Sequence, residues 1–180
     1  MMFPDYQKVC NPEAQQRFES LWNSSLSNTP GLTVVETMQA ITAGTVKGMY
    51  ILGENPAMSD PDLNHARKAL AALDFLVVQD IFLTETASLA DIVLPASAFP
   101  EKTGTFTNTD RLVQLGQQAI DPPGQARQDL WIIQSIAQGL GLDWHYRSVE
   151  EVFDEMRHAM HSIEGITWQR LEREHAVVYP

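Results

Sequence analysis

The stretch GMYILGENPAMSDPDLNHARKALAALDFLVVQD, residues 48–80, decides the fold. Two uninterrupted apolar runs, Gly48–Leu52 and Phe75–Val78, stand at its ends, and each is short enough for a buried strand. Between them, Asp60-Pro61 supplies a helix cap followed by proline at the first helical position. Leucine and alanine then recur at helical spacing up to Leu73. Strand, helix and strand in succession predict a βαβ unit, and therefore a parallel sheet with a right-handed crossover.

The flanking sequence extends this pattern in both directions. Another apolar run, Asp91–Pro95, predicts a third strand, and a loop is expected at Pro100–Gln114. Helices are predicted at 12–21, 33–43, 60–73, 84–89, 130–140 and 149–160. The predicted fold class is therefore α/β, a parallel sheet with flanking helices and Rossmann-like dinucleotide-binding topology. The predicted organisation is a connecting arm at 1–31, an α/β domain at 32–145 and a helical extension at 146–180.

Composition excludes several classes of function. The 180 residues are 44% apolar, which is enough for one domain with a substantial core. A net charge of −11 with only 12 Lys and Arg argues against a nucleic-acid partner. No run approaches the roughly 20 apolar residues that cross a bilayer, so no membrane insertion is expected. The single cysteine, Cys10, allows no internal disulfide and no multi-cysteine metal site, which favours a reducing, cytoplasmic setting.

Polar residues follow each predicted strand, where ligands of open parallel sheets bind. Gly53-Glu54-Asn55-Pro56 follows the first strand, Gln79-Asp80 with Thr84 and Thr86 the second, and the loop from Glu101 to Arg111 the third. A carboxylate at such a position can accept hydrogen bonds from the N1–H and N2–H₂ edge of guanine, and Asp80 is the candidate. The residues alone favour a purely structural interpretation, with a turn at Gly53 and helix caps at Asp80, Thr84 and Thr86. No GxGxxG or GxxxxGK[ST] motif indicates an independent NAD or ATP site.

Histidines and paired carboxylates offer weaker candidates. His158 and His161 lie three apart on a predicted helix and could share a metal, but no motif supplies a third ligand. We therefore expect a structural or solvated role for both, and a surface position for His65. The carboxylate pairs Glu150-Glu151 and Asp154-Glu155 are typical of a solvated helix face rather than of acid–base catalysis.

Three segments together resemble one known family. They are GMYILGENPAMSDPDLNHARKAL (48–70), LDFLVVQDIFLTETASLADIVLPASAFPEKTGTFTNTDRLVQ (73–114) and PPGQARQDLWIIQSIAQGLGLDW (122–144). In this order and spacing they are similar to formate dehydrogenase α subunits of the molybdopterin oxidoreductase family. The ending EEVFDEMRHAMHSIEGITWQRLE follows the same pattern, so the resemblance covers nearly the whole chain.

The resemblance implies a role in holding a cofactor. The parent enzyme would oxidise formate to carbon dioxide at molybdenum or tungsten held by two molybdopterin guanine dinucleotides, and pass electrons to iron–sulfur clusters. Residues 32–145 are similar to the family's third domain, which contacts one dinucleotide. The positions matching the family's cofactor-binding motifs are Gly53, Glu54 and Asn55, then Gln79, Asp80 and Thr84, and nearer the pterin Gly104, Thr107, Asn108 and Arg111. Where the family commonly has a second arginine, this chain has Leu112.

The resemblance also places the redox chemistry elsewhere. The family's metal-ligating cysteine or selenocysteine, its neighbouring histidine and its iron–sulfur cysteines have no counterpart here, so the isolated chain should not turn over formate. Partners would be the remaining domains of the catalytic subunit and electron-transfer subunits. Two alternatives remain open: a stand-alone assembly or interaction protein of a redox complex, and a fragment of a nitrate reductase or NADH-dehydrogenase large subunit.

Overall fold

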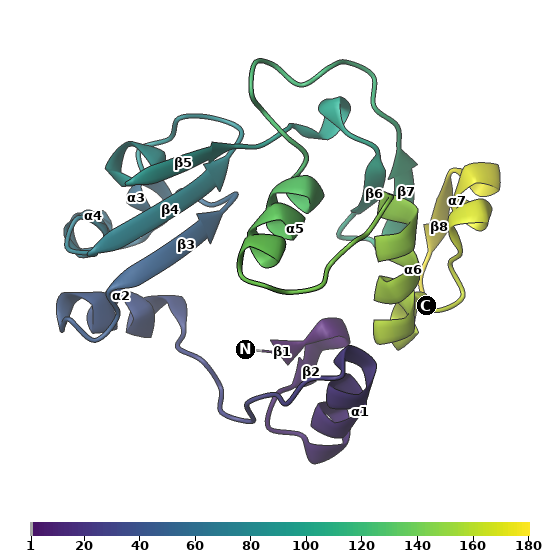
Figure 1. The fold of residues 1–180 in the computed structure, drawn as a ribbon, viewed down its shortest axis with the longest axis horizontal. Coiled ribbons are helices and arrows are strands. Elements are labelled where there is room, and N and C mark those ends of the chain that lie inside the picture. Colours follow the sequence, from purple (N-terminus) through teal and green to yellow (C-terminus); the bar gives the residue numbers. More distant parts are fainter. Residues whose placement is uncertain (1) are drawn as a thin grey trace. The chain divides into compact units, whose positions relative to one another are not determined.

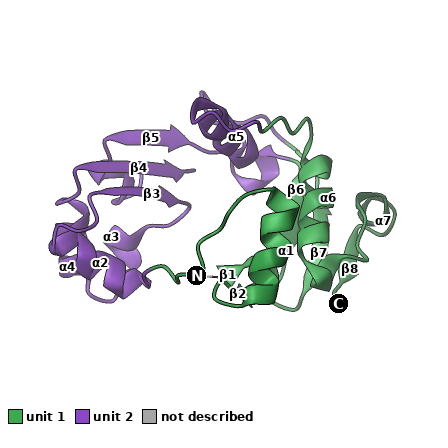
Figure 2. Ribbon diagram, turned by 60° about the horizontal axis from the view of Figure 1, so that its bottom comes forward, with its two compact units in different colours: residues 1–31, 103–119, 144–180 green, residues 32–102, 120–143 purple. Residues whose placement is uncertain are grey.

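A computed structural model describes residues 2–180, which form two compact units (Figure 2). One unit comprises residues 32–102 and 120–143, and is called the parallel-sheet unit. The other comprises residues up to 31, 103–119 and 144–180, and is called the antiparallel-sheet unit. Both units combine stretches that are distant in sequence, whereas the predicted ranges 1–31, 32–145 and 146–180 are consecutive. The division into an arm, an α/β domain and a helical extension therefore stays a prediction.

The parallel-sheet unit is built around strands β3 (Gly48–Leu52), β4 (Phe75–Asp80) and β5 (Ile92–Pro95). They pair in parallel in the order β3-β4-β5, with Tyr50 opposite Val77 and Val77 opposite Ile92 (Figure 1). The predicted α/β class is therefore confirmed. Across residues 2–180 this sheet does not reverse its strand order, and the Rossmann-like topology stays a prediction.

Three helices cover one face of this sheet: α2 (Val34–Thr42), α3 (Pro56–Ser59) and α4 (Leu63–Leu70). Thr33 and Glu36 form a capping box at the start of α2, as Thr33 Oγ1 accepts from Glu36 N and Glu36 Oε2 from Thr33 N. The helices bury alanine and other apolar side chains against the strands. The resulting core consists of Met38, Ile41, Ile51, Ala57, Ala66, Ala69, Leu70, Leu76, Val78 and Ala87.

Two predicted helix starts in this unit were wrong. Asp62, not Asp60, caps α4 by accepting from His65 N, while Asp60 Oδ1 accepts from Asp62 N and shapes the preceding turn. The helix predicted at 84–89 is only the single 3-10 turn η2 (Ala87–Leu89). Thr86, which precedes this turn, donates its backbone N–H to Asn55 Oδ1 and not to a backbone carbonyl one helical turn earlier.

The unit is completed by the 3-10 turn η3 (Phe99–Glu101) and helix α5 (Asp129–Gly139). A parallel bridge between Ala96 and Arg127 fixes the segment before α5 alongside the end of β5. The α5 helix was predicted within one residue of its observed start and end.

The antiparallel-sheet unit contains β6 (Gly104–Thr107), β7 (Leu112–Gly116) and β8 (Ala176–Val178), paired in that order. The loop predicted at 100–114 was therefore wrong, because most of it is the β6–β7 hairpin. Arg111, at φ 67°, closes the turn, with its N–H donating to Asn108 O at 2.9 Å. No glycine marks this turn in the sequence, so the usual hairpin signal is missing.

Short elements and helices fill the rest of this unit. They are β1 (Met2–Phe3), η1 (Pro4–Tyr6), β2 (Gln7–Lys8), α1 (Pro12–Trp22), α6 (Val149–Ala159), η4 (His161–Ile163) and α7 (Trp168–Glu174). One core packs α6 and α7 against β7 and β8 through Phe153, Leu171 and Val177, and a smaller core surrounds Phe18 of α1. Among the described residues, no helix has the length and apolar character needed to cross a membrane.

Candidate functional site

The carboxyl end of β3 turns sharply at Gly53. This residue has φ 65°, a conformation that costs an L side chain free energy but not glycine. Its N–H still donates to Gln79 O at 2.9 Å, so the ladder with β4 continues up to the turn. Glu54 follows as an exposed residue. The predicted Gly53-Glu54-Asn55 segment is therefore a turn at the sheet edge where ligands of parallel sheets bind.

Asn55 cross-links this turn to the segment after β4. Its Oδ1 accepts from the hydroxyl of Thr86 at 2.7 Å and from the backbone N–H of Thr86 at 3.2 Å, and its Nδ2 donates to Glu85 Oε2 at 2.8 Å. The bond from Asn55 is the main cause that lowers the pKa of Glu85. Thr86 is fully buried, and its hydroxyl also accepts from Ala57 N. Asn55 and Thr86 together hold two strand-end loops in one arrangement.

Asp80 ends β4 and is half-buried. Its Oδ1 accepts from the N–H of Ile81 at 2.7 Å and of Phe82 at 3.4 Å, an Asx turn that orients the side chain. Its Oδ2 accepts no hydrogen bond from any residue in the described range 2–180. Thr84 has a capping role, because its Oγ1 accepts from Ala87 N at 3.1 Å.

Gln79 is wholly buried within a polar network. Its Oε1 accepts from the Tyr50 hydroxyl, and its Nε2 donates to Asp129 Oδ1 at 2.7 Å. Asp129 Oδ2 in turn pairs with Lys102 Nζ, which donates to Ser97 O at 3.0 Å. Burial of the hydroxyl, and secondly the charge of Asp129, raise the pKa of Tyr50. The network ties β3, β4, α5 and the segment after η3 to one another.

The four remaining predicted residues lie in the antiparallel-sheet unit. Gly104 begins β6 and Thr107 ends it, while Asn108 and Arg111 form the exposed turn to β7. Asn108 Oδ1 accepts from Gln114 Nε2 at 3.0 Å, which steadies the turn. The Arg111 guanidinium makes no ion pair or hydrogen bond with other residues of the described chain.

The structure thus brings together six of the ten predicted residues, Gly53 to Asn55 with Gln79, Asp80 and Thr84, at one edge of the parallel sheet. The other four share one hairpin. Sequence reasoning missed the roles of Glu85 and Thr86 as partners of Asn55, and of Tyr50, Lys102 and Asp129 around Gln79. The stretch Thr84-Glu85-Thr86 was a usable signal for the first pair. The Gln79–Asp129 contact spans fifty positions and has no local sequence signal.

A cavity of about 230 Å³ lies beside these strand ends. It is lined by Ile81, Phe82, Pro95, Ala96, Ala98, Glu101, Pro123, Gln125 and Ala126. The side chains of Phe82 and Leu83, next to the cavity in sequence, are 73% and 74% exposed. The cavity is mainly apolar. Its lining includes Ile81, the residue that follows Asp80 in the sequence.

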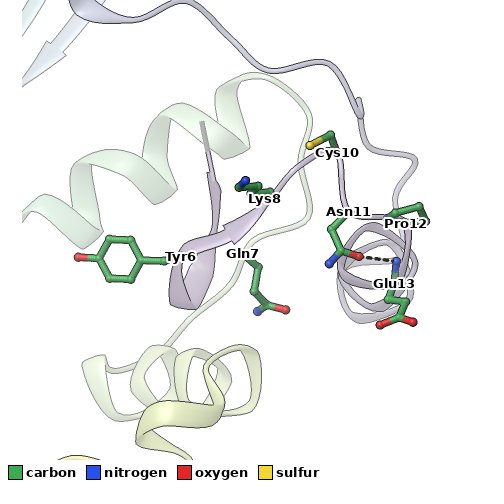
Figure 3. A pocket seen from close by; sticks show the side chains of 7 residues that line it. All are labelled: Tyr6, Gln7, Lys8, Cys10, Asn11, Pro12 and Glu13. Carbon is green, nitrogen blue, oxygen red and sulfur yellow. Dashed lines mark hydrogen bonds between the residues drawn. The ribbon is translucent and has the colours of Figure 1, made fainter.

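A broader and more open hollow of about 750 Å³ lies in the antiparallel-sheet unit (Figure 3). Its lining comprises Tyr6, Gln7, Lys8, Cys10, Asn11, Pro12 and Glu13, none of which is a predicted site residue. The Asn11 side chain is occupied in capping α1, where it accepts from Glu13 N at 2.9 Å. The smaller cavity, in contrast, adjoins the ends of β4 and β5 through Ile81 and Pro95.

The histidine pair is divided between two elements. His158 is in α6, with Nδ1 2.6 Å from Asp154 O, whereas His161 is in η4, with Nδ1 3.5 Å from Glu164. The shared helix predicted for them was wrong, since α6 ends at Ala159. Within residues 2–180 no three His, Cys, Asp or Glu side chains are grouped as metal ligands.

The chain is similar over most of its length to known proteins. The chain is 49% identical over 173 residues to the F420-dependent formate dehydrogenase subunit alpha of Methanocaldococcus jannaschii, covering 95% of this chain and 25% of that protein. It is 46% identical over 173 residues to F420-dependent formate dehydrogenase 2 subunit alpha of Methanococcus maripaludis, again covering 25% of the relative. The chain therefore spans about a quarter of the length of these relatives.

A solved structure shows the same fold. Acetylene hydratase from Pelobacter acetylenicus matches 99% of this chain with a TM-score of 0.68 at 21% identity, over 25% of its own length. Residues 9–139 match the molybdopterin oxidoreductase family. Since that match covers well over half of the residues and agrees with the fold, the chain belongs to the molybdopterin oxidoreductase family.

Proposed function

We propose that this chain is part of the catalytic polypeptide of a formate-oxidising enzyme, in which it holds the guanine-dinucleotide portion of a molybdopterin cofactor. The observation that carries the proposal is the Asp80 carboxylate at the carboxyl end of the parallel sheet. One of its oxygens is fixed by the Asx turn and the other has no partner among the residues described. When bound, the cofactor supplies the metal centre, molybdenum or tungsten, at which formate loses its electrons.

The residues present fit the base of such a cofactor. Guanine offers adjacent N1–H and N2–H₂ donors, and an ionised carboxylate offers only acceptors. Both lone pairs of Asp80 Oδ1 are used by Ile81 N and Phe82 N, so Oδ2, with two lone pairs of its own, is the oxygen that accepts from the base. The mainly apolar cavity that begins at Ile81 offers a surface for a flat heterocycle.

The other matching residues divide into framework and contact roles. Asn55, Gln79 and Thr84 use their side chains for internal hydrogen bonds, so they position the loops rather than reach a ligand. Gly53 and Glu54 leave an exposed turn that a nucleotide can approach closely.

In the β6–β7 hairpin, Gly104, Thr107 and Asn108 shape a loop that presents Arg111. A guanidinium is well suited to an anionic group of the cofactor. Leu112 in place of the family's second arginine leaves this hairpin with a single positive charge at that point.

The proposal extends to the surroundings of the chain. The remaining domains of the catalytic polypeptide would provide the metal ligand and the iron–sulfur cysteines, and further subunits would accept the electrons. A cytoplasmic setting fits the single exposed thiol of Cys10. Without those parts we expect the 180-residue chain to bind nucleotide weakly and not to oxidise formate.

Calorimetric titration with guanosine diphosphate tests the role of Asp80. The variant Asp80→Asn keeps an acceptor for the Asx turn but replaces the other oxygen by a donor, so binding should be lost while the melting temperature is retained. Asp74→Asn is the matched control, because Asp74 is an exposed carboxylate at the opposite end of β4. Equal affinity of the wild type and Asp80→Asn, or equal binding of adenosine diphosphate, would disprove guanine recognition by Asp80.

A further inference from the structure

The two faces of the β3-β4-β5 sheet differ in their burial. On the face packed against α2, α3 and α4, Ile51, Leu76 and Val78 are at most 5% exposed. On the opposite face the apolar side chains lie open: Tyr50 and Leu52 are each 43% exposed, Phe75 49% and Ile92 42%. The register places Tyr50 beside Val77 and Val77 beside Ile92, so these side chains form one continuous surface, called the open face below.

The sequences of the strands predict a sheet that is buried on both faces. GMYIL, FLVV and IVLP are uninterrupted apolar runs, whereas a strand with one solvated face alternates apolar and polar residues. The contacts within the parallel-sheet unit account for only one of the two apolar sets. Within that unit the other set is covered only in part, by α5.

Topology explains why the cover is one-sided. The strands follow one another across the sheet in chain order, so right-handed crossovers place their connections on the same face. Helix α5 covers part of the open face: its first residue, Asp129, binds Gln79 at the end of β4, and Ile132 and Ile136 line a groove of about 180 Å³ with Leu94 of β5. A covering layer for the rest must come from segments other than those that connect these strands.

Two sources of such a layer differ in electrostatic cost. A second copy would bring another net charge of −11 against the first, and like charge opposes self-association. The second source is the rest of the polypeptide: about three quarters of the length of each relative lies outside the part that matches this chain. We propose that the open face is the docking surface for an apolar helical layer contributed by that further part of the catalytic polypeptide. This inference rests on the proposed function only in taking the chain as part of such a polypeptide.

Cysteine accessibility tests the proposal. Phe75→Cys and Ile92→Cys are each made in a Cys10→Ser background, and thiol alkylation is followed by peptide mass spectrometry. The labelling rates are compared between the 180-residue chain and a chimera. In the chimera, the whole 180-residue chain replaces the matching part of the M. jannaschii formate dehydrogenase subunit alpha. We expect labelling at both positions to be at least ~10-fold slower in the chimera, because reaction there requires local opening. Ile51→Cys, on the covered face, should be protected in both contexts and reports correct folding.

Each outcome decides the question. Equal labelling of Phe75→Cys and Ile92→Cys in both contexts would overturn the proposal. Protection already present in the isolated chain and lost on dilution would identify a second copy as the occupant instead. If Ile51→Cys reacts in the chimera, the substitutions are made at the aligned positions of the M. jannaschii subunit itself. No nucleotide is present in this experiment, so its result is independent of the role assigned to Asp80.

Discussion

Gln79 Nε2 donates a 2.7 Å hydrogen bond to Asp129 Oδ1, which joins the end of β4 to the first residue of α5. Gln79 has no exposed surface, and its Oε1 also accepts from the Tyr50 hydroxyl. A buried amide without such partners would be costly, because desolvation is not recovered. The bond therefore contributes to fixing the strand end that carries Asp80.

Gln79→Leu is expected to destabilise the fold. The substitution removes both side-chain bonds and leaves Tyr50 and Asp129 each with one partner fewer, at a cost of about 1 to 3 kcal/mol. Urea unfolding followed by circular dichroism measures the change. Gln169→Leu serves as the control, since the exposed Gln169 amide only donates to Glu150, and its effect should stay within ~0.5 kcal/mol. Equal effects of the two variants would mean that the Gln79 network contributes no more than a surface bond.

Thr86→Val tests the cross-link between the two strand-end loops. The change keeps the shape of the side chain but removes the hydroxyl that binds Asn55 and accepts from Ala57 N. A buried backbone donor is then left unpaired, so we expect a loss of about 1 to 3 kcal/mol in unfolding free energy. The matched control is Thr45→Val, whose exposed hydroxyl donates only to Ala40 O. A loss no larger than that of the control would contradict a structural role for Thr86.

The parallel sheet could be predicted from sequence because its signals are local. Uninterrupted apolar runs and the periodic helix at 63–70 identify β3, β4, β5 and α4 without knowledge of distant contacts. The start of α4 was placed two residues early because Asp60 and Asp62 are equally good caps in sequence. Only the hydrogen bonds distinguish them.

The failures occur where distant partners or unusual turns determine the structure. The run GTFTNTD has a glycine and an asparagine that favour a loop, yet Gly104–Thr107 is a strand because it pairs with β7. Arg111 adopts a left-handed conformation that glycine or asparagine normally fills, so the hairpin has no typical turn residue. The framework around Asn55 and Gln79 likewise depends on residues far along the chain, which no local pattern reveals.

Alkaline pH should weaken the fold through Tyr146. Its hydroxyl donates to Glu155 Oε2 at 2.5 Å, and burial, this hydrogen bond and the carboxylate charge raise the pKa of Tyr146 to about 12 from 10.0. The folded chain thus holds a proton that the unfolded chain releases, and this contribution declines as the pH rises from about 10 to 12. Tyr146→Phe should flatten the fall in stability over that interval, measured by urea unfolding at successive pH values. Tyr6→Phe changes a side chain that is 87% exposed, so the dependence of stability on pH should stay the same as in the wild type. A profile unchanged by Tyr146→Phe would refute the assignment.

The ion pair of Lys102 and Asp129 should be coupled more strongly than the surface pair of Lys47 and Asp74. The Lys102 and Asp129 side chains are only 19% and 30% exposed, and Asp129 also binds Gln79. Removing one partner leaves a poorly solvated charge, so a double-mutant cycle with Lys102→Met and Asp129→Asn should give a coupling of about 0.5 to 3 kcal/mol.

The control cycle uses Lys47→Met and Asp74→Asn, whose charged atoms are 3.7 Å apart on side chains 72% and 68% exposed. Water and salt screen that pair, so its coupling should be about 0 to 1 kcal/mol and should fall further at high ionic strength. The Lys102–Asp129 coupling should respond less to salt, because the surrounding protein limits the access of counterions. Equal couplings with the same salt dependence would show that Asp129 is held by Gln79 alone, and that Lys102 does not help to fix α5 against the end of β4.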